Sequence, residues 1–421
     1  MMGLIEVSRM AFRRVGGLAA GLMAAGLLGA CALGGAGPDS VTTTGIAPGA
    51  QPAATSPLAK RSSVKVALLL PLSAKGRAAS IAKGLKQAGE LALFEFDKPN
   101  VLLFSKDTHG TPEGARAAAE DAVRNGAELI IGPLYARSVP AVRDVARSAG
   151  IPVMAFSSDR SVAGNGVYLL SFLAGADIPR VVSYSLARGK RRFAALIPKT
   201  RYGDVVEQNF RSTVSRLGGE VLGVQRFPLD ANGMMAPTRK IKAIASSAAK
   251  SGQPLDAVFL PAGQEALPTL STLLPYFEID TKSIQLIGSG AWDYASVGQE
   301  KPLLGGWYPA PDPKGWREFA RRYSETYGGI PPRIASLAYD AVSLAVSLST
   351  NPPGQRYTVA NLTRPSGFAG VDGLFRLRPD GTTERGLAVL EVQKFGARVL
   401  DPAPSVFGRP RYSSLTRTPL N

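Results

Sequence analysis

The sequence predicts an α/β protein made of two similar units that follow each other along the chain. Short apolar runs alternate with stretches of helical periodicity, first over residues 64–171 and again over 193–288. The first run, 64–70, is almost continuously apolar and stops at Pro71, as expected of a strand buried on both faces of a parallel sheet. Such strand–helix alternation favours open sheets with right-handed crossovers.

Each expected strand of the first unit leads into a helix with a recognisable end. The alanine-rich stretch 113–124 stops just before Gly126, and the following helix stops before Gly150. Glycine favours a helix end because it tolerates a left-handed backbone. The expected strands are 64–70, 101–104, 129–131, 152–156 and 167–171, and the expected helices are 78–96, 113–124 and 138–148.

The second unit repeats this order, although the sequence itself shows no detectable repeat. Gly218 and Gly219 end its first helix. The expected strands are 193–197, 221–227, 257–260 and 284–288, and the expected helices are 205–217, 237–250 and 265–275.

A different order of elements closes the chain. Two further helices, 315–327 and 334–348, follow the segment Pro309-Ala310-Pro311. The apolar runs 373–377 and 387–392 then flank Pro379-Asp380-Gly381, a turn signal, so we expect these two runs to pair as a hairpin.

Length and composition exclude several classes of protein. The 421 residues allow two to three domains of ~150 residues each, and 45% hydrophobic with 19% charged residues describe a folded chain. One cysteine excludes an intramolecular disulfide and a cysteine-based zinc site. One histidine, His109, excludes a multi-histidine metal centre. We therefore expect no metal and no cofactor.

Enzyme motifs are weak, and we expect no catalysis. Ser62-Ser63-Val64-Lys65 matches S-x-x-K, but it enters the first strand, where serine and lysine would not share a helical face. The net charge of +17 suits anionic envelope polymers or membrane surfaces as partners, or it serves solubility alone. The basic runs lack the interleaved aromatic residues of a nucleic-acid platform, so we expect no nucleic-acid partner.

Residues 1–30 resemble a lipoprotein signal peptide. Arg13 and Arg14 precede an uncharged stretch, 15–30, that is short for a permanent membrane span. Leu28-Gly29-Ala30-Cys31 resembles a bacterial lipobox, in which the thiol of Cys31 takes a diacylglycerol. Ordinary cleavage around Ala30-Cys31-Ala32 is the alternative and would leave no anchor. The absence of aspartate after the cysteine resembles an outer-membrane address.

The segment 31–62 is rich in glycine, alanine, proline, serine and threonine, a composition typical of a flexible tether. Acyl chains on Cys31 would attach this tether stably to a membrane. Residues 401–421 are expected to form an extended tail.

Two α/β units followed by late helices and a late hairpin resemble the type I periplasmic binding-protein fold of the Leu/Ile/Val type. In that fold the chain crosses three times between two lobes, each a parallel sheet flanked by helices. The resemblance therefore implies a first lobe of 63–178 plus 312–362 and a second of 179–311 plus 363–400. The motifs that carry the resemblance are Leu70-Pro71-Leu72-Ser73, Asp107-Thr108, Gly132-Pro133-Leu134, Tyr202-Gly203, Asp256-Ala257-Val258-Phe259 and Ala338-Tyr339-Asp340-Ala341.

Within that superfamily, the lipobox, Ile131-Gly132-Pro133-Leu134 and Gly373-Leu374-Phe375-Arg376 look most like the penicillin-binding protein activators. This resemblance implies a non-enzymatic, lipid-anchored protein on the periplasmic side of the envelope. It would regulate a peptidoglycan synthase, with a bifunctional penicillin-binding protein or another envelope protein as its partner. The tether leads directly into the first strand, without the helical-repeat domain that such activators can carry. The alternative is the substrate-binding lipoprotein of an ABC importer for amino acids or other small molecules.

A ligand of an open α/β sheet lies beyond the carboxyl ends of the strands, where helix N-termini favour an anion. Candidate residues in those loops of the first unit are Ser73, Thr108, Tyr135, Ser138, Ser157 and Ser158. Those of the second unit are Tyr202, Glu265 and Trp292, beside Gln264 and Asp293.

The family's amino-acid site is matched only in part. Tyr202 matches its cleft tyrosine, and Glu265 lies within a residue of its ammonium-binding carboxylate. Ala136 stands where a hydroxyl is expected, which weakens the case for an amino acid. Alternatively, Tyr202 is a turn residue that caps a helix, Glu265 is a solvated carboxylate favoured by a helix dipole, and Trp292 packs at a lobe edge.

Overall fold

The computed structural model of the chain describes residues 63–97 and 99–407. The expected signal peptide 1–30, the tether 31–62, the lipidation site Cys31 and residues 408–421 of the expected tail lie outside these residues. Across the described ranges, no helix is both long and apolar enough to cross a membrane.

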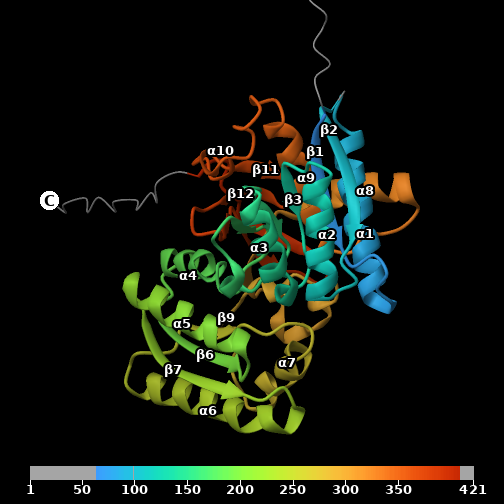
Figure 1. Cartoon of the computed structure of the whole chain (residues 1–421). Helices are drawn as coiled ribbons and strands as arrows, with labels where there is room; N and C mark the ends of the chain where they lie inside the picture. Colours follow the sequence, from blue (N-terminus) through green and yellow to red (C-terminus); the bar gives the residue numbers. More distant parts are fainter. Residues whose placement is uncertain (1–62, 98, 408–421) are drawn as a thin grey trace, which may run out of the picture. The chain divides into compact units, whose positions relative to one another are not determined.

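The first lobe is built on a five-stranded parallel sheet (Figure 1). Its strands are β1 (Val64–Leu70), β2 (Val101–Asp107), β3 (Leu129–Ile131), β4 (Val153–Ala155) and β5 (Val167–Leu169), in the spatial order β2-β1-β3-β4-β5. Side chains of β1 alternate between two cores: Leu68 packs on one face, and Leu69 on the other. Burial on both faces explains the continuous apolar run in the sequence.

Helices cover both faces of this sheet. On one face lie α1 (Gly76–Phe94), α8 (Pro313–Tyr327) and α9 (Ala335–Leu348); on the other lie α2 (Pro112–Arg124) and α3 (Val139–Ser148). Gly89 lets α1 approach α9 closely, since a Cβ there would lie 3.3 Å from Val342. A short helix, α10 (Val359–Leu362), follows α9 and buries Leu362 in the same core.

The second lobe is built on a seven-stranded mixed sheet in the order β15-β14-β10-β9-β8-β6-β7. The parallel strands are β6 (Arg192–Pro198), β7 (Glu220–Phe227), β8 (Ala257–Leu260), β9 (Gln285–Gly288) and β10 (Trp307–Ala310). The antiparallel strands are β14 (Ala388–Val392) and β15 (Ala397–Asp401). One face carries α4 (Ile178–Ala187) and α5 (Arg201–Arg216), and the other carries α6 (Ala231–Lys250) and α7 (Leu267–Tyr276).

The late strands divide between the lobes, which corrects the expectation that 363–400 belongs as a block to the second lobe. Strands β11 (Phe368–Gly370), β12 (Gly373–Leu377) and β13 (Thr383–Arg385) form a small antiparallel sheet. Phe368, Phe375 and Leu377 from this sheet are buried in the first lobe's core, because apolar residues alternate toward α9. Only β14 and β15 join the second sheet.

The expected hairpin also has a different partner. The turn at Pro379-Asp380-Gly381 connects β12 to β13, which was not expected as a strand, and β14 instead pairs with β10 and β15. The connections between the lobes therefore run through 170–177, 311–312 and 386–387.

Candidate functional site

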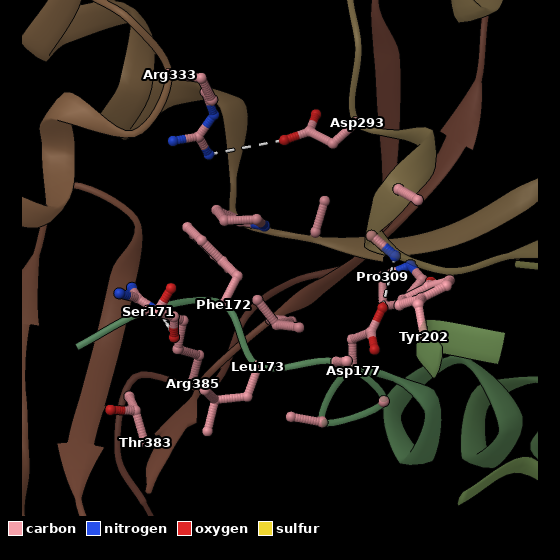
Figure 2. A pocket seen from close by; sticks show the side chains of 18 residues that line it. Ser171, Phe172, Leu173, Asp177, Tyr202, Asp293, Pro309, Arg333, Thr383 and Arg385 are labelled. Atoms are coloured by element: carbon pink, nitrogen blue, oxygen red, sulfur yellow. Dashed lines mark hydrogen bonds and ion pairs between the residues drawn. The ribbon is translucent and has the colours of Figure 1, made fainter. Parts of the chain in front are cut away.

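The three connections between the lobes enclose a cavity of about 310 Å³ (Figure 2). Each connection contributes a stretch of backbone to its wall, and residues from the second sheet's loops and from the start of α9 complete it. The lining residues are 171–177, Tyr202, Gly290, Ala291, Asp293, 309–311, Arg333, Thr383, Arg385 and Leu387.

Two carboxylates line the second-lobe side of the cavity. Asp177 immediately precedes α4, and its Oδ2 oxygen accepts a hydrogen bond of 2.6 Å from the backbone N–H of Gly290. Gly290 opens the short helix η3 (Gly290–Trp292), and Asp293 follows it directly. Because the surrounding protein replaces water around both carboxyl groups, the pKa values of Asp177 and Asp293 are raised.

Arg333 lies on the first-lobe side, just before α9. Its Nη2 nitrogen is 2.7 Å from the Oδ1 oxygen of Asp372, which is fully buried, and 3.6 Å from the Oδ2 oxygen of Asp293. Its guanidinium carbon lies 4.6 Å from the centre of the Trp316 ring. The contacts with Asp372 and Trp316 hold the guanidinium in position, while the contact with Asp293 bridges the two lobes.

Arg385 ends β13 and closes the far side of the cavity. Its guanidinium carbon is 4.3 Å from the centre of the Phe172 ring, and Phe375 lies on its other flank. The Nη1 and Nη2 nitrogens are buried and form no hydrogen bond with any group in residues 63–97 and 99–407. Arg385 thus lines the cavity with its guanidinium against the Phe172 ring.

Asp340 lies buried on α9 behind Arg385. Its Oδ1 oxygen accepts a hydrogen bond of 2.7 Å from the backbone N–H of Val371. Burial, together with the negative charge of Asp372, raises the pKa of Asp340 to about 7, although Arg385 and Arg333 oppose the shift. The carboxyl of Asp340 thus ties the small antiparallel sheet to α9.

Tyr202 is the predicted cleft residue that lines this cavity. Its Oη atom lies 2.8 Å from the Oγ of Ser289, and burial with the nearby charge of Asp177 raises its pKa. It sits in the first turn of α5, which Thr200 caps by accepting a hydrogen bond from Gly203. A Cβ at Gly203 would lie 1.9 Å from the carbonyl oxygen of Pro198, so only glycine permits this tight start.

The remaining wall is apolar. Phe172, which is 39% exposed, and Leu173 face the same space as Pro309 (Figure 2). Leu387 also lines the cavity. A small, mostly apolar chamber with a few convergent charged groups is the usual form of a small-molecule site. The arrangement can bind a molecule with an apolar body and a charged head.

The predicted residues at the carboxyl edge of the first sheet lie outside this cavity. Ser73 is exposed, and its Oγ is 2.8 Å from the Nδ1 of His109, which is also 3.2 Å from the Oδ2 of Asp107. Ser73 and Asp107 both contact the same ring nitrogen, Nδ1 of His109. These three residues are therefore not arranged as a catalytic triad, in which the two ring nitrogens of the histidine bond the serine and the aspartate separately. Two backbone N–H groups, of Ser73 and His109, bond Asp107, so the group fixes two loops together.

The other hydroxyls of this edge differ in accessibility. Thr108, Ser138 and Ser157 are buried, whereas Ser158 is exposed. Half-buried Tyr135 lies 5.3 Å below the guanidinium carbon of Arg137, which donates to the carbonyl of Gly110. The structure thus brings Tyr135 to the loop after β2, and makes three of the hydroxyls hard for a ligand to reach.

Two predicted residues of the second lobe are also separate from the cavity. Glu265 is exposed, and its Oε1 oxygen accepts a hydrogen bond of 3.1 Å from the backbone of Gly263. Trp292 is fully buried and donates its Nε1–H to the carbonyl of Leu260, at 2.9 Å. The indole is therefore part of the second lobe's core and is not available to a ligand.

Sequence reasoning did not select Asp177, Arg333 or Arg385. It named Asp293 among the second-lobe residues that face the ligand loops, but assigned it no role. The connections at 170–177 and 309–311 were treated as ends of strands or as breaks, and the segment after Gly370 as a hairpin. The sequence nevertheless contains a sign of this site. Asp177 is a charged residue within the otherwise apolar stretch 167–182, and burying a charge that has no role is costly.

A family model described as a periplasmic binding protein matches residues 63–397. This chain belongs to the periplasmic binding protein family. The match covers both lobes of the binding protein and most of the described residues. No curated protein matches the sequence.

Solved structures share the fold of this periplasmic binding protein. A protein from Rhodospirillum rubrum, described as a branched-chain amino acid ABC transporter, is 19% identical with a TM-score of 0.70 over 80% of this chain and 100% of its own. A solute-binding protein from Rhodopseudomonas palustris in complex with 3,4-dihydroxybenzoic acid is 18% identical. Its TM-score is 0.55, over 81% of this chain and 98% of its own. A branched-chain amino acid binding protein from Streptococcus pneumoniae in complex with isoleucine is 17% identical. Its TM-score is 0.54, over 81% of this chain and 100% of its own.

Proposed function

We propose that this periplasmic binding protein is a solute-binding protein of an importer, and that it takes a small solute into the cavity between its lobes. The observation that carries the proposal is the cavity itself, which all three inter-lobe connections line. A molecule bound there touches the segments that must bend when the lobes move. Such closure around a ligand is the usual hinge motion of this architecture.

The size and lining of the cavity support a small carboxylate or amino acid as the solute. A volume of about 310 Å³ lies at the lower end of small-molecule sites, and one wall is apolar while the other is charged. Isoleucine and 3,4-dihydroxybenzoic acid, found in two proteins of similar fold, are both small carboxyl compounds with an apolar part. The binding residues and the family support a non-catalytic role and a periplasmic location.

The test is a thermal-unfolding screen of the full-length chain against amino acids, 3,4-dihydroxybenzoate and other small carboxylates, followed by calorimetry. A ligand at 100 times its dissociation constant stabilises the folded state by about 2.7 kcal/mol. Ala291→Phe, which fills the cavity, should remove the shift, whereas Ala295→Phe, at an exposed residue outside the cavity, should keep it. The absence of any shift with every solute would contradict the proposal.

A second candidate is the regulation of a peptidoglycan synthase by a lipid-anchored envelope protein. It is supported by the lipobox at Cys31, the net charge of +17 and the missing hydroxyl at Ala136. This function needs no occupied cavity. The test is a capture experiment with a purified bifunctional penicillin-binding protein. If both the native chain and Ala291→Phe capture this protein, and neither binds a solute, regulation of a peptidoglycan synthase is favoured over import.

A further inference from the structure

The chain crosses between the lobes a fourth time, after its last strand. Strand β15 leaves the second sheet at Asp401, and residues 402–407 continue without regular secondary structure. Ala403 still packs against the second lobe's core, whereas Phe407 lies on the small antiparallel sheet of the first lobe. In Figure 1 the described chain accordingly ends beside α10 and β12. We call residues 402–407 the strap; none of them lines the cavity.

Arg180 on α4 fastens the start of the strap to the second lobe. Its Nη1 nitrogen lies 2.7 Å from the Oδ2 oxygen of Asp401, and its Nη2 nitrogen donates to the carbonyl oxygens of Asp401 and Pro402, each at 3.2 Å. Its Nε nitrogen donates to the carbonyl oxygen of Leu387, in the third connection between the lobes, at 2.8 Å. Because a guanidinium offers five N–H donors in a rigid plane, this one side chain fixes the strap and the neighbouring connection together.

Pro404 packs against the third connection itself. A Cβ added at Gly386 would lie 3.0 Å from the Cγ atom of Pro404, so the two segments approach closely. Proline has a fixed φ angle, and the strap contains two prolines, which makes it stiffer than a segment of ordinary composition. A six-residue segment spans at most about 20 Å even when fully extended, so its two ends cannot separate far.

Phe407 fastens the other end of the strap to the first lobe. The centre of its ring lies 4.6 Å from the guanidinium carbon of Arg376 in β12. The ring also lies against Gly367, where an added Cβ would be 2.8 Å from the Cε2 atom of Phe407. Arg376 is held in place by Glu384, which accepts a hydrogen bond of 2.8 Å from its Nε nitrogen. The small sheet therefore provides a fixed site for the ring.

We propose that the strap restrains the movement of the two lobes, and that docking of Phe407 on Arg376 and Gly367 sets how far they can move. With both ends attached, the short strap resists separation of Asp401 from β12. When the ring leaves Arg376, only the connections at 170–177, 311–312 and 386–387 join the lobes, and these can bend further. Phe407 is half-buried, and a cation–π contact at such a site is weak enough to open and close.

The experiment measures the distance between the lobes by double electron–electron resonance, with no solute present. Spin labels are attached to cysteines introduced at Ser80 on α1 of the first lobe and at Ser247 on α6 of the second, both of which are exposed. Cys31, the single cysteine of the sequence, is replaced by serine, so the full-length chain carries only these two labels. With the strap docked, we expect a narrow distribution of distances.

Four variants test the contact. Phe407→Ala should raise the share of molecules outside the native distance peak about fivefold. Arg376→Gln should do the same from the other side of the contact, and Glu384 keeps its bond of 2.7 Å with Arg378. Phe407→Tyr keeps an aromatic ring over Arg376 and should give the native distribution. Val406→Ala is the matched control and should leave the distribution unchanged, because Val406 is 70% exposed.

Native distance distributions in both Phe407→Ala and Arg376→Gln would overturn the proposal, because the lobes would then be restrained without the ring. Equal broadening in Val406→Ala and Phe407→Ala would also overturn it. Urea denaturation of each labelled variant completes the test. Broadening with a native unfolding midpoint supports the strap, whereas broadening that appears only with a large loss of stability means that the first lobe itself has loosened, which contradicts it. Because no solute is present, failure of the proposed function would not alter these results.

Discussion

Arg333 and Asp293 belong to different lobes, yet the Nη2 nitrogen of Arg333 lies 3.6 Å from the Oδ2 oxygen of Asp293. The same nitrogen lies 2.7 Å from Asp372, whose side chain is fully buried. One guanidinium thus serves a structural partner within its lobe and an accessible partner across the cavity. The two contacts should differ sharply in their effect on stability.

Asp372→Asn should lower the free energy of unfolding by about 1–3 kcal/mol, because Asp372 is fully buried and loses its charged bond to Arg333, whose side chain is 36% exposed. Asp293→Asn should change it by less than about 1 kcal/mol, since exposed pairs contribute little. Urea denaturation at pH 7 measures both. An equal loss in the two variants would show that the contact between the lobes is itself structural.

Trp292 was expected at the cleft and is instead a core residue. Trp292→Ala should lower the free energy of unfolding by about 3–5 kcal/mol, because it leaves a large cavity and an unpaired carbonyl at Leu260. Tyr276→Ala, at a side chain that is 68% exposed, is the control and should cost far less. Thermal unfolding of the three proteins compares them; similar melting temperatures would contradict the packing described here.

Gly203→Ala should destabilise the chain by about 1–3 kcal/mol or more and should also weaken solute binding. The added Cβ would lie 1.9 Å from the backbone oxygen of Pro198 and must displace the first turn of α5, which carries Tyr202. Gly329→Ala is the matched control, because no atom lies within 4 Å of the Cβ it adds. Denaturation and calorimetry together test the pair; a Gly203→Ala protein with native binding would refute the role of this turn.

Asp340 should make stability depend on pH. Burial raises its pKa to about 7 in the folded state, so the folded chain holds a proton there that the unfolded chain releases at lower pH. Its contribution to stability is therefore full below about pH 4 and is lost as the pH rises toward 7. Asp340→Asn keeps an oxygen for the N–H of Val371 and should flatten the change in unfolding free energy between pH 5 and 8.

The check is chemical denaturation of the native and variant chains at several pH values. Asp293→Asn is the comparison variant. The pKa of Asp293 is also raised, but its side chain is accessible, so this substitution should alter the pH dependence of stability less than Asp340→Asn does. A native curve that does not fall between pH 5 and 7, or an Asp340→Asn curve that falls equally steeply, would contradict the assignment.

The lobe architecture could be predicted from the sequence because apolar periodicity records burial. The run 64–70 is a strand with both faces covered, and its residues alternate between two cores as that pattern requires. Strand β10 was missed because its Pro309 suggested a break; it pairs parallel with β9 and antiparallel with β14. Strand β13 was missed because its sequence, Thr383-Glu384-Arg385, contains no apolar residue, whereas the equally short β3 is entirely apolar.

The candidate site was harder to predict, because its residues come from segments without periodicity. Tyr202 was found through its resemblance to the cleft tyrosine in the Tyr-Gly step of the family, and this step opens α5. Arg333 and Asp293 are far apart in sequence, and only the folded connections between the lobes bring them together. For Trp292 the sequence left a cleft position and packing as alternatives, because position in a loop does not reveal whether a side chain turns inward, and the structure shows it buried.

Both cores join residues that are far apart in the sequence. The first core contains Val64 from β1 together with Phe375 from β12, and the second sheet gains β14 beside β10 only at Ala388. A nascent polypeptide therefore cannot finish the first lobe before β12, or the second before β14, has left the ribosome. Truncation before β14 would leave β10 as an open apolar strand edge, so we expect shortened chains to aggregate or be degraded.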